Sequence, residues 1–145
     1  MRRALKRSFI PKLDQLGFAG RANSFQRILP NAQDLLSLQY WKYGGEFILE
    51  FARRERGALV TSWGKTVSEE EIDVAYIDPR HRARLEQVGP SAGAHLQGFD
   101  FSPFGTDFSK YEALANQVAG LLADVDAWLR EYRPSQHVRT LGGKA

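Results

Sequence analysis

The stretch DLLSLQYWKYGGEFILEFARRE, residues 34–55, decides the fold. Apolar side chains occupy every second position on both sides of its glycine pair: Leu36, Leu38 and Tyr40 before it, and Phe47, Leu49 and Phe51 after it. Such alternation is typical of strands that bury one face of a sheet, because successive side chains point to opposite faces. A glycine pair between two alternating runs indicates a tight turn. The stretch therefore predicts two antiparallel strands joined by a hairpin.

Shorter runs on either side extend this hairpin. SFQRIL at 24–29 and ALVTSW at 58–63 have strand composition, and Gly57 marks a chain reversal before the second run. Strands joined by connections this short pair as antiparallel neighbours. In EIDVAYI, residues 71–77, alternation predicts a further strand, although the overlapping SEEE also matches a helix capping box. HLQGFDF, residues 95–101, is one more candidate, so we expect a meander of four to six strands.

The N-terminal segment RRALKRSFIPKLDQLGF, residues 2–18, predicts a helix. Its apolar side chains recur at helical spacing on one face: Leu5, Phe9, Leu13 and Leu16. Pro11 predicts a kink or a late start near Ser8, because proline removes a backbone hydrogen bond and clashes with the preceding turn. Gly17 is a natural helix end.

The longest helix is predicted near the C-terminus. Ser109 and Glu112 match a capping box, helical apolar spacing continues to Tyr132, and Pro134 stops it. A short helix is also expected after Asp78, which is a suitable N-cap. The order of elements predicts an α+β fold, in which the N-terminal helix and the long C-terminal helix pack on one face of the antiparallel meander.

The chain of 145 residues has the length of one domain. We expect a single α+β domain over residues 1–133 and a disordered tail over residues 134–145. Residues 89–109 form an irregular, glycine-rich stretch. A loop this long in a compact domain is usually functional or mobile.

Composition narrows the classes of protein. The hydrophobic fraction of 43% and charged fraction of 26% are ordinary for a globular protein, and a net charge of +3 permits an anionic partner without requiring one. The absence of cysteine excludes disulfides, thiolate nucleophiles and cysteine-bound metals. No apolar run is long enough for a bilayer, and the basic N-terminus lacks the apolar region of a secretory signal. We therefore expect a cytoplasmic protein without membrane contacts, with an organelle-targeting N-terminus as the alternative.

The N-terminal half resembles a known family. In LKRSFIPKLDQLGFAGRANSFQRI, residues 5–28, a helix ends in Leu-x-x-Leu-Gly-Phe, and a basic linker leads to a strand with an aromatic residue and an arginine: Leu13, Leu16, Gly17, Phe18, Phe25 and Arg27. This pattern resembles the opening of a bacterial domain-of-unknown-function family, serial four-three-zero-four. LQYWKYGGEFILEF and IDPRHRARL are similar to later segments of it, so the resemblance covers residues 1–85 and implies the fold. No reaction is assigned to that family, and by analogy small domains of this kind are often toxin-neutralising or accessory binding proteins.

No catalytic signature is visible in the sequence. The histidines His81, His95 and His137 lie in a basic segment, a glycine-rich loop and the expected tail, which does not predict a metal site. The chain lacks a GxSxG elbow and a phosphate-binding loop ending in GK[ST]. The run Glu69–Glu71 is interpreted as a solvated acidic face. We therefore expect no catalytic residues, no metal and no cofactor, although an enzyme is not excluded.

A basic cluster is the first candidate binding site. Arg80, His81, Arg82 and Arg84 follow Asp78 and Pro79, where the sequence predicts the start of a short helix. Free N–H groups at a helix start together with guanidinium groups form a good anion receptor. The alternative is a plain surface neutralised by Glu69–Glu71 or Asp73.

A second candidate surface lies on the hairpin strands. Trp41, Tyr43, Arg53 and Arg54 place aromatic and cationic side chains on the sheet, and such residues are favoured in protein-binding surfaces. Acidic residues are interspersed with them, so cross-strand ion pairing is the simpler account.

We expect a small, non-enzymatic domain that binds another protein, of immunity or accessory type, through the open sheet face (Trp41, Tyr43, Arg53, Arg54) and the basic cluster (Arg80, His81, Arg82, Arg84). One alternative is a sensor or enzyme for a small anionic ligand, with a pocket under the Gly89–Phe108 loop and the anion held by Arg82 and Arg84. Another is a weak nucleic-acid binder. The first hypothesis requires that the sheet face opposite the helices is uncovered.

Overall fold

The structure, a computed structural model, describes residues 1–87 and 98–141. Its α-helices are α1 (Arg2–Ser8), α2 (Ile10–Gln15), α3 (Phe108–Gly120) and α4 (Leu122–Glu131), and its short 3-10 turns are η1 (Glu69–Glu71), η2 (Val74–Tyr76), η3 (Pro79–His81) and η4 (Ser102–Phe104). Its strands are β1 (Ala19–Arg21), β2 (Ser24–Leu29), β3 (Ala32–Tyr40), β4 (Glu46–Arg54), β5 (Leu59–Val60), β6 (Thr66–Val67), β7 (Ala83–Leu85), β8 (Phe99–Asp100) and β9 (Val138–Thr140).

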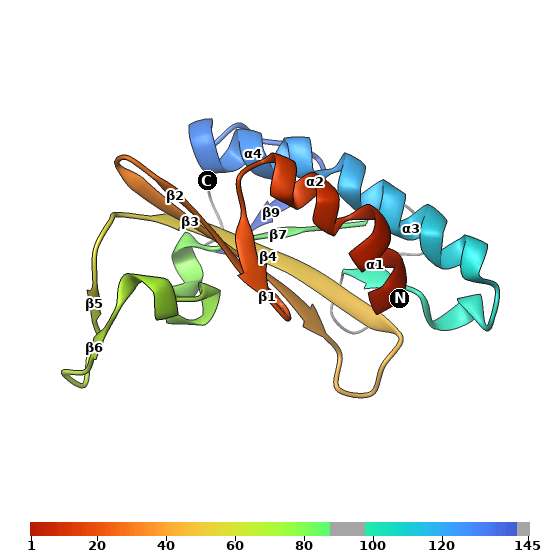
Figure 1. Ribbon diagram of the computed structural model, residues 1–145, viewed down its shortest axis with the longest axis horizontal. Helices are drawn as coiled ribbons and strands as arrows, with labels where there is room; N and C mark the ends of the chain where they lie inside the picture. The colour runs from red at the N-terminus through yellow and green to blue at the C-terminus, as the bar shows by residue number, and fades with distance from the viewer. Residues whose placement is uncertain (88–97, 142–145) are drawn as a thin grey trace.

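The predicted α+β fold is confirmed. In the described part of the chain, seven strands form one antiparallel sheet in the order β1-β2-β3-β4-β7-β9, with β8 also paired to β4. The four helices cross one face of this sheet (Figure 1). We call this the upper face. The β5–β6 hairpin and the 3-10 turns η1 and η2 lie on the opposite, lower face.

The N-terminal helix breaks where proline predicted a kink. α1 ends at Ser8 and α2 begins at Ile10, with Pro11 in the first turn of α2. At the end of α2 the N–H of Gly17 donates to Asp14 and the N–H of Phe18 donates to Leu13. This is a Schellman motif, and Gly17 adopts the required positive φ of 93°.

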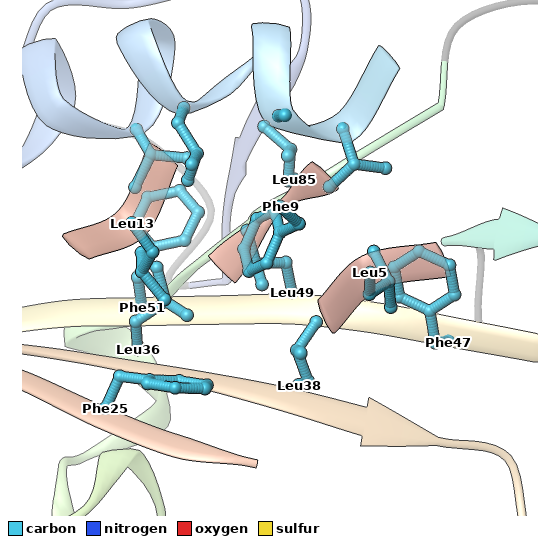
Figure 2. Packing of buried hydrophobic residues seen from close by; sticks show 14 of the residues in the cluster. Leu5, Phe9, Leu13, Phe25, Leu36, Leu38, Phe47, Leu49, Phe51 and Leu85 are labelled. Carbon is cyan, nitrogen blue, oxygen red and sulfur yellow. The ribbon is translucent and has the colours of Figure 1, made fainter. Parts of the chain in front are cut away.

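The predicted hairpin has the expected register. Leu38 of β3 pairs with Leu49 of β4, and Leu36 pairs with Phe51, so the apolar side chains of both strands lie on the upper face. Figure 2 shows three side chains of the N-terminal helices in line above three side chains of β4: Leu5, Phe9 and Leu13 above Phe47, Leu49 and Phe51. Helix periodicity and strand alternation therefore meet in one core.

The C-terminal helix is present with three differences from the prediction. Asp107, not Ser109, is its N-cap, and its carboxylate accepts the backbone N–H of Ser109 at 3.1 Å. Leu121 separates α3 from α4, and α4 ends before Tyr132. The capping-box prediction placed the helix start too late, because a serine inside the first turn resembles a cap.

The lower face is covered, contrary to expectation. Ile72, Val74 and Ile77 pack with Leu35 and Ala52 of the sheet in a second core. The prediction of a strand at residues 71–77 was wrong, since this segment forms η1 and η2, and its alternating apolar residues serve packing instead of strand pairing. The run ALVTSW also leaves the meander and pairs only with β6.

The segment after Asp78 and the C-terminal residues also differ from expectation. Asp78 caps only the single turn η3, and the chain then enters β7. β9 pairs antiparallel with β7, so the prediction of a disordered tail from residue 134 is wrong for Val138–Thr140. The strand predicted within residues 95–101 is confirmed as β8.

A buried ion network joins the elements at one end of the sheet. The fully buried carboxylate of Asp34 accepts Nε of Arg27 at 2.9 Å and binds Arg53 through Nε at 2.6 Å and Nη2 at 3.0 Å. Nη1 of Arg27 binds the C-terminal carbonyl of α2 at Leu16 and the carboxylate of Asp126 on α4. Three strands and two helices therefore meet at one carboxylate and its partners.

We predict that Asp34→Asn strongly destabilises the fold. The substitution keeps the side-chain shape but leaves two buried or half-buried guanidinium groups without their shared counter-charge, so the free energy of unfolding falls by about 3–5 kcal/mol. Urea unfolding measures it. Asp14→Asn, an exposed position on α2, is the matched control. An equal, small loss in both variants would contradict the central role of Asp34.

Candidate functional site

The structure brings several of the predicted basic residues to one pocket beside this ion network. The pocket has a volume of about 370 Å³ and lies where the end of β4, η3, α4 and β9 meet. It is lined by Arg53, Arg80, His81, Arg82, Trp128, Tyr132 and Thr140. No aspartate or glutamate is among these described lining residues, so the exposed wall is cationic and aromatic.

The aromatic wall comes from α4. The indole of Trp128 packs edge-on against Phe51 of the core, with ring centroids 5.5 Å apart. The ring of Tyr132 contacts Trp128 in the same manner at 5.3 Å and is 63% exposed. One side of the wall is thus anchored in the core and the other faces solvent.

Tyr132 has an unusual backbone for its residue type. It is the C-cap of α4 with φ 53° and ψ 31°, a left-handed conformation that glycine adopts without strain. A side chain with a Cβ is disfavoured there by about 1–2 kcal/mol. The fold therefore holds a tyrosine ring at the pocket edge at the position where a glycine would stabilise the helix end.

The cationic wall differs in how far its charges are neutralised. Arg53 is held by Asp34, whose hydrogen bond raises the pKa of the guanidinium, and its side chain remains 20% exposed. Arg80 is exposed and binds Asp78 at 2.8 Å. Hydrogen bonds from the side chain and backbone of Arg80 lower the pKa of Asp78 to about 2, so this carboxylate is ionised at neutral pH. His81 adds an exposed imidazole.

Two of the predicted anion-binding arginines instead have a structural role. Arg82 and Arg84 both bind Glu50, a buried carboxylate in the middle of β4, at 3.0 and 2.9 Å. Arg82 also donates to the carbonyls of Ala75 and Ile77, which holds η2 against the lower face. The counter-charge is therefore neither Glu69–Glu71 nor Asp73, as one alternative predicted, but a glutamate from the sheet.

The four residues predicted to form a binding surface on the open sheet face lie in different parts of the structure. Trp41 and Tyr43 lie in the β3–β4 turn, and Arg53 lies at the other end of β4, on the order of 25 Å away at the usual rise per residue. Arg53 and Arg54 point to opposite faces, and Arg54 donates to Gln33 and to the carbonyl of Gly57 on the lower face. These four residues do not form one surface.

A metal site, a membrane-spanning helix and the Gly89–Phe108 loop were also considered in the sequence. Within residues 1–87 and 98–141, no three His, Asp or Glu side chains gather so as to hold a metal ion. None of the helices in the same ranges is long and apolar enough to span a membrane. Residues 89–97 of the predicted Gly89–Phe108 loop, His95 among them, lie outside the described residues, and the rest of it contains β8, η4 and the first residue of α3.

Sequence reasoning missed the aromatic wall. Trp128 and Tyr132 were assigned to the apolar stripe of a helix, which fits Trp128 but not the exposed Tyr132. Pro134 indicates only that the helix ends near Tyr132, so no local signal indicated that this ring lies exposed beside the basic residues. No local signal indicated that Glu50 is the partner of Arg82, since these residues lie far apart in the sequence.

Comparison with known proteins found no protein-family model, no curated protein and no solved structure that matches the chain. The resemblance to the domain-of-unknown-function family therefore remains a prediction, and the candidate site is judged by its geometry alone.

We predict that Arg82 and Arg84 differ in their contribution to stability although both bind Glu50. Arg82→Gln removes donors to one carboxylate and two carbonyls, and we expect a loss of about 2–4 kcal/mol in the free energy of unfolding. Arg84→Gln leaves Glu50 paired with Arg82, and we expect about 1 kcal/mol. Urea unfolding of both variants measures the two losses in the free energy of unfolding. Equal losses would show that the two carbonyl contacts of Arg82 add nothing.

Proposed function

We propose that the chain is a cytoplasmic binding protein for a small ligand that carries an anionic group and a flat, apolar part. The observation that carries this proposal is the pocket itself, in which the aromatic wall of Trp128 and Tyr132 stands beside the guanidinium groups of Arg53 and Arg80 and the imidazole of His81. Its volume of about 370 Å³ falls within the range of small-molecule sites.

The chemistry of the two walls defines the ligand class. Guanidinium groups donate to carboxylate or phosphate oxygens, often with two hydrogen bonds at once. An exposed tyrosine ring offers a face or edge for a planar group, and its contact with the anchored Trp128 limits its movement. The strained backbone of Tyr132 supports the proposal further, because such strain concentrates at functional sites.

A protein partner is the second candidate, and one specific observation favours it. The β5–β6 hairpin projects from the body of the molecule (Figure 1), and Trp63 and Val60 at its end are 73% and 66% exposed. The turn is ordered by bonds from the N–H of Thr61 to Lys65 and from the N–H of Gly64 to Thr61. Tryptophan is enriched at the centres of protein interfaces, so this hairpin replaces the open sheet face as the proposed protein contact.

The first proposal is tested by ligand-induced thermal shifts and calorimetry with adenosine monophosphate, indole-3-acetate, inorganic phosphate and indole. Ligands with both an anion and a ring are expected to stabilise the protein, by about 2.7 kcal/mol at a concentration 100 times Kd. Inorganic phosphate carries only the anionic group and indole only the planar ring, and each is expected to bind at least tenfold more weakly.

Two variants locate that effect. Arg80→Gln and Tyr132→Leu are each expected to reduce the affinity at least fivefold, whereas Lys110→Gln on α3 is a charge-matched control outside the pocket. The proposal fails when neither two-part ligand binds, or when binding survives both pocket variants unchanged.

The second candidate is tested by capture from an extract of cells that encode the chain. A partner that depends on the hairpin is retained by the wild type and by Tyr76→Ser, an exposed aromatic outside the hairpin, and is lost with Trp63→Ser. The purified pair is then expected to show at least a tenfold weaker Kd for Trp63→Ser. Equal capture by all three proteins would remove the hairpin from consideration.

A further inference from the structure

The opposite end of the sheet carries cations that the proposed pocket does not use. α1 contains Arg2, Arg3, Lys6 and Arg7 but no acidic residue in its first turn. Of these, Arg7 lies 3.7 Å from Glu112 of α3, and Arg3 lies over the ring of Phe108. Arg2 and Lys6 instead face the sheet side of α1, where both line a hollow against β2 and β3.

Aromatic rings alternate with these cations. The guanidinium of Arg2 lies 3.8 Å above the ring of Tyr40 at the end of β3. In the following turn, the ammonium of Lys42 lies 4.9 Å from the ring of Tyr43, and Trp41 contacts Tyr43 edge-on at 5.0 Å. Tyr43 is 72% exposed, so this ring has a large accessible face.

Two adjoining hollows connect these groups into one groove. One, of about 360 Å³, includes Arg2, Lys6 and Tyr40. The other, of about 510 Å³, includes Arg2, Tyr40, Trp41 and Lys42. They share Arg2 and Tyr40, and neither has an aspartate or glutamate among its described lining residues. We call this the α1 groove, defined by Arg2, Lys6, Tyr40, Trp41 and Lys42.

We propose that the α1 groove binds single-stranded nucleic acid. Proteins that bind single strands combine a cationic groove along the phosphates with aromatic rings on which bases stack. Here Lys6, Arg2 and Lys42 supply cations along the groove, and Tyr43 supplies an accessible ring beside Lys42. The absence of carboxylates from the described lining removes the repulsion that a polyanion would otherwise meet.

The shape of the site favours a strand over a membrane surface. A membrane-bound protein presents its apolar side chains outward to enter the lipid interface. In the α1 groove the cations and the ring of Tyr40 line a concavity, and the exposed Tyr43 contacts two of the lining residues, Trp41 and Lys42. A double helix is disfavoured as well, because stacking on Tyr43 requires an unpaired base.

The experiment measures fluorescence anisotropy of a labelled twelve-residue oligothymidylate with the intact chain at several salt concentrations. Three phosphate contacts predict a slope of about −2 for log K against log salt on a single strand. Arg2→Gln combined with Lys42→Gln is expected to weaken binding at least tenfold. Tyr43→Ala is expected to weaken it at least fivefold, since base stacking contributes about 1–3 kcal/mol.

The controls separate this proposal from the others. Lys12→Gln together with Lys110→Gln removes equal charge outside the groove and is expected to leave affinity within twofold. Tyr132→Leu is also expected to have no effect, so a failure of the pocket proposal does not touch this one. Far-ultraviolet circular dichroism checks that each variant is folded, and Lys42→Gln alone in the turn is the fallback where the double variant unfolds.

Three results would overturn the proposal: no binding at 50 mM salt, an equal loss in the control pair, or affinity for phosphatidylserine vesicles or a matching duplex equal to that for the oligothymidylate. Binding of the oligothymidylate that falls with both the cation pair and Tyr43→Ala supports it.

Discussion

The carboxylate of Asp34 is the constraint on which this structure depends. It is fully buried in β3 and is shared by Arg27 of β2 and Arg53 of β4, so the central three strands have a charged contact across them in addition to backbone pairing. Arg27 extends the contact to the end of α2 and to Asp126 of α4. Burial alone raises the pKa of Asp126, but hydrogen bonds from Arg27 and Arg130 outweigh it and lower the pKa overall. Buried charges of this kind are poor stabilisers by themselves, yet they penalise every arrangement in which one partner is missing. The network therefore fixes the position of the helices on the sheet. Because Arg53 belongs to it, the network also fixes the position of one arginine in the cationic wall of the pocket.

On the lower face a second buried carboxylate, that of Glu50, is also shared by two arginines. Glu50 is a buried glutamate on the sheet face opposite Leu49 and Phe51, and Arg82 and Arg84 make its burial tolerable. Arg82 uses its remaining donors to hold the η2 turn, so the cover over Leu35 and Ala52 is attached by polar as well as apolar contacts. Two arginines of the basic cluster are thus committed to the fold. Arg80 and His81 are exposed, and they line the pocket together with Trp128 and Tyr132.

The sequence predicted those parts of the molecule whose signals are local. The β3–β4 hairpin, the break near Pro11 and the helix end at Gly17 depend on residues that are neighbours in the chain, and all are present. The alternation at Ile72 and Val74 led to the wrong prediction of a strand, because a turn that packs on a sheet can have the same apolar spacing as a strand that pairs with it. Of the residues predicted for binding, Arg53, Arg80, His81 and Arg82 lie at one pocket, but Trp128 and Tyr132 could not be placed beside them without the tertiary structure. The pairing of Arg82 with Glu50 could not be predicted either, because a buried glutamate and an arginine far from it in the chain share no sequence pattern.

The pairing of β9 with β7 has a consequence for how the molecule assembles. The meander from β1 to β4 closes through short connections, so its loop-closure entropy is small and it can order early. The β7–β9 ladder joins segments separated by α3 and α4, and it brings Thr140 to the lining of the pocket. The two ends of the sheet therefore differ in how far apart their parts lie in the sequence: the described lining of the α1 groove comes from residues 1–45 and Phe101, whereas the pocket combines residues of β4, η3, α4 and β9. Thr140 of β9 lines the pocket and no residue of β9 is among the described lining of the α1 groove, so local opening of β9 would change the pocket without changing the groove lining.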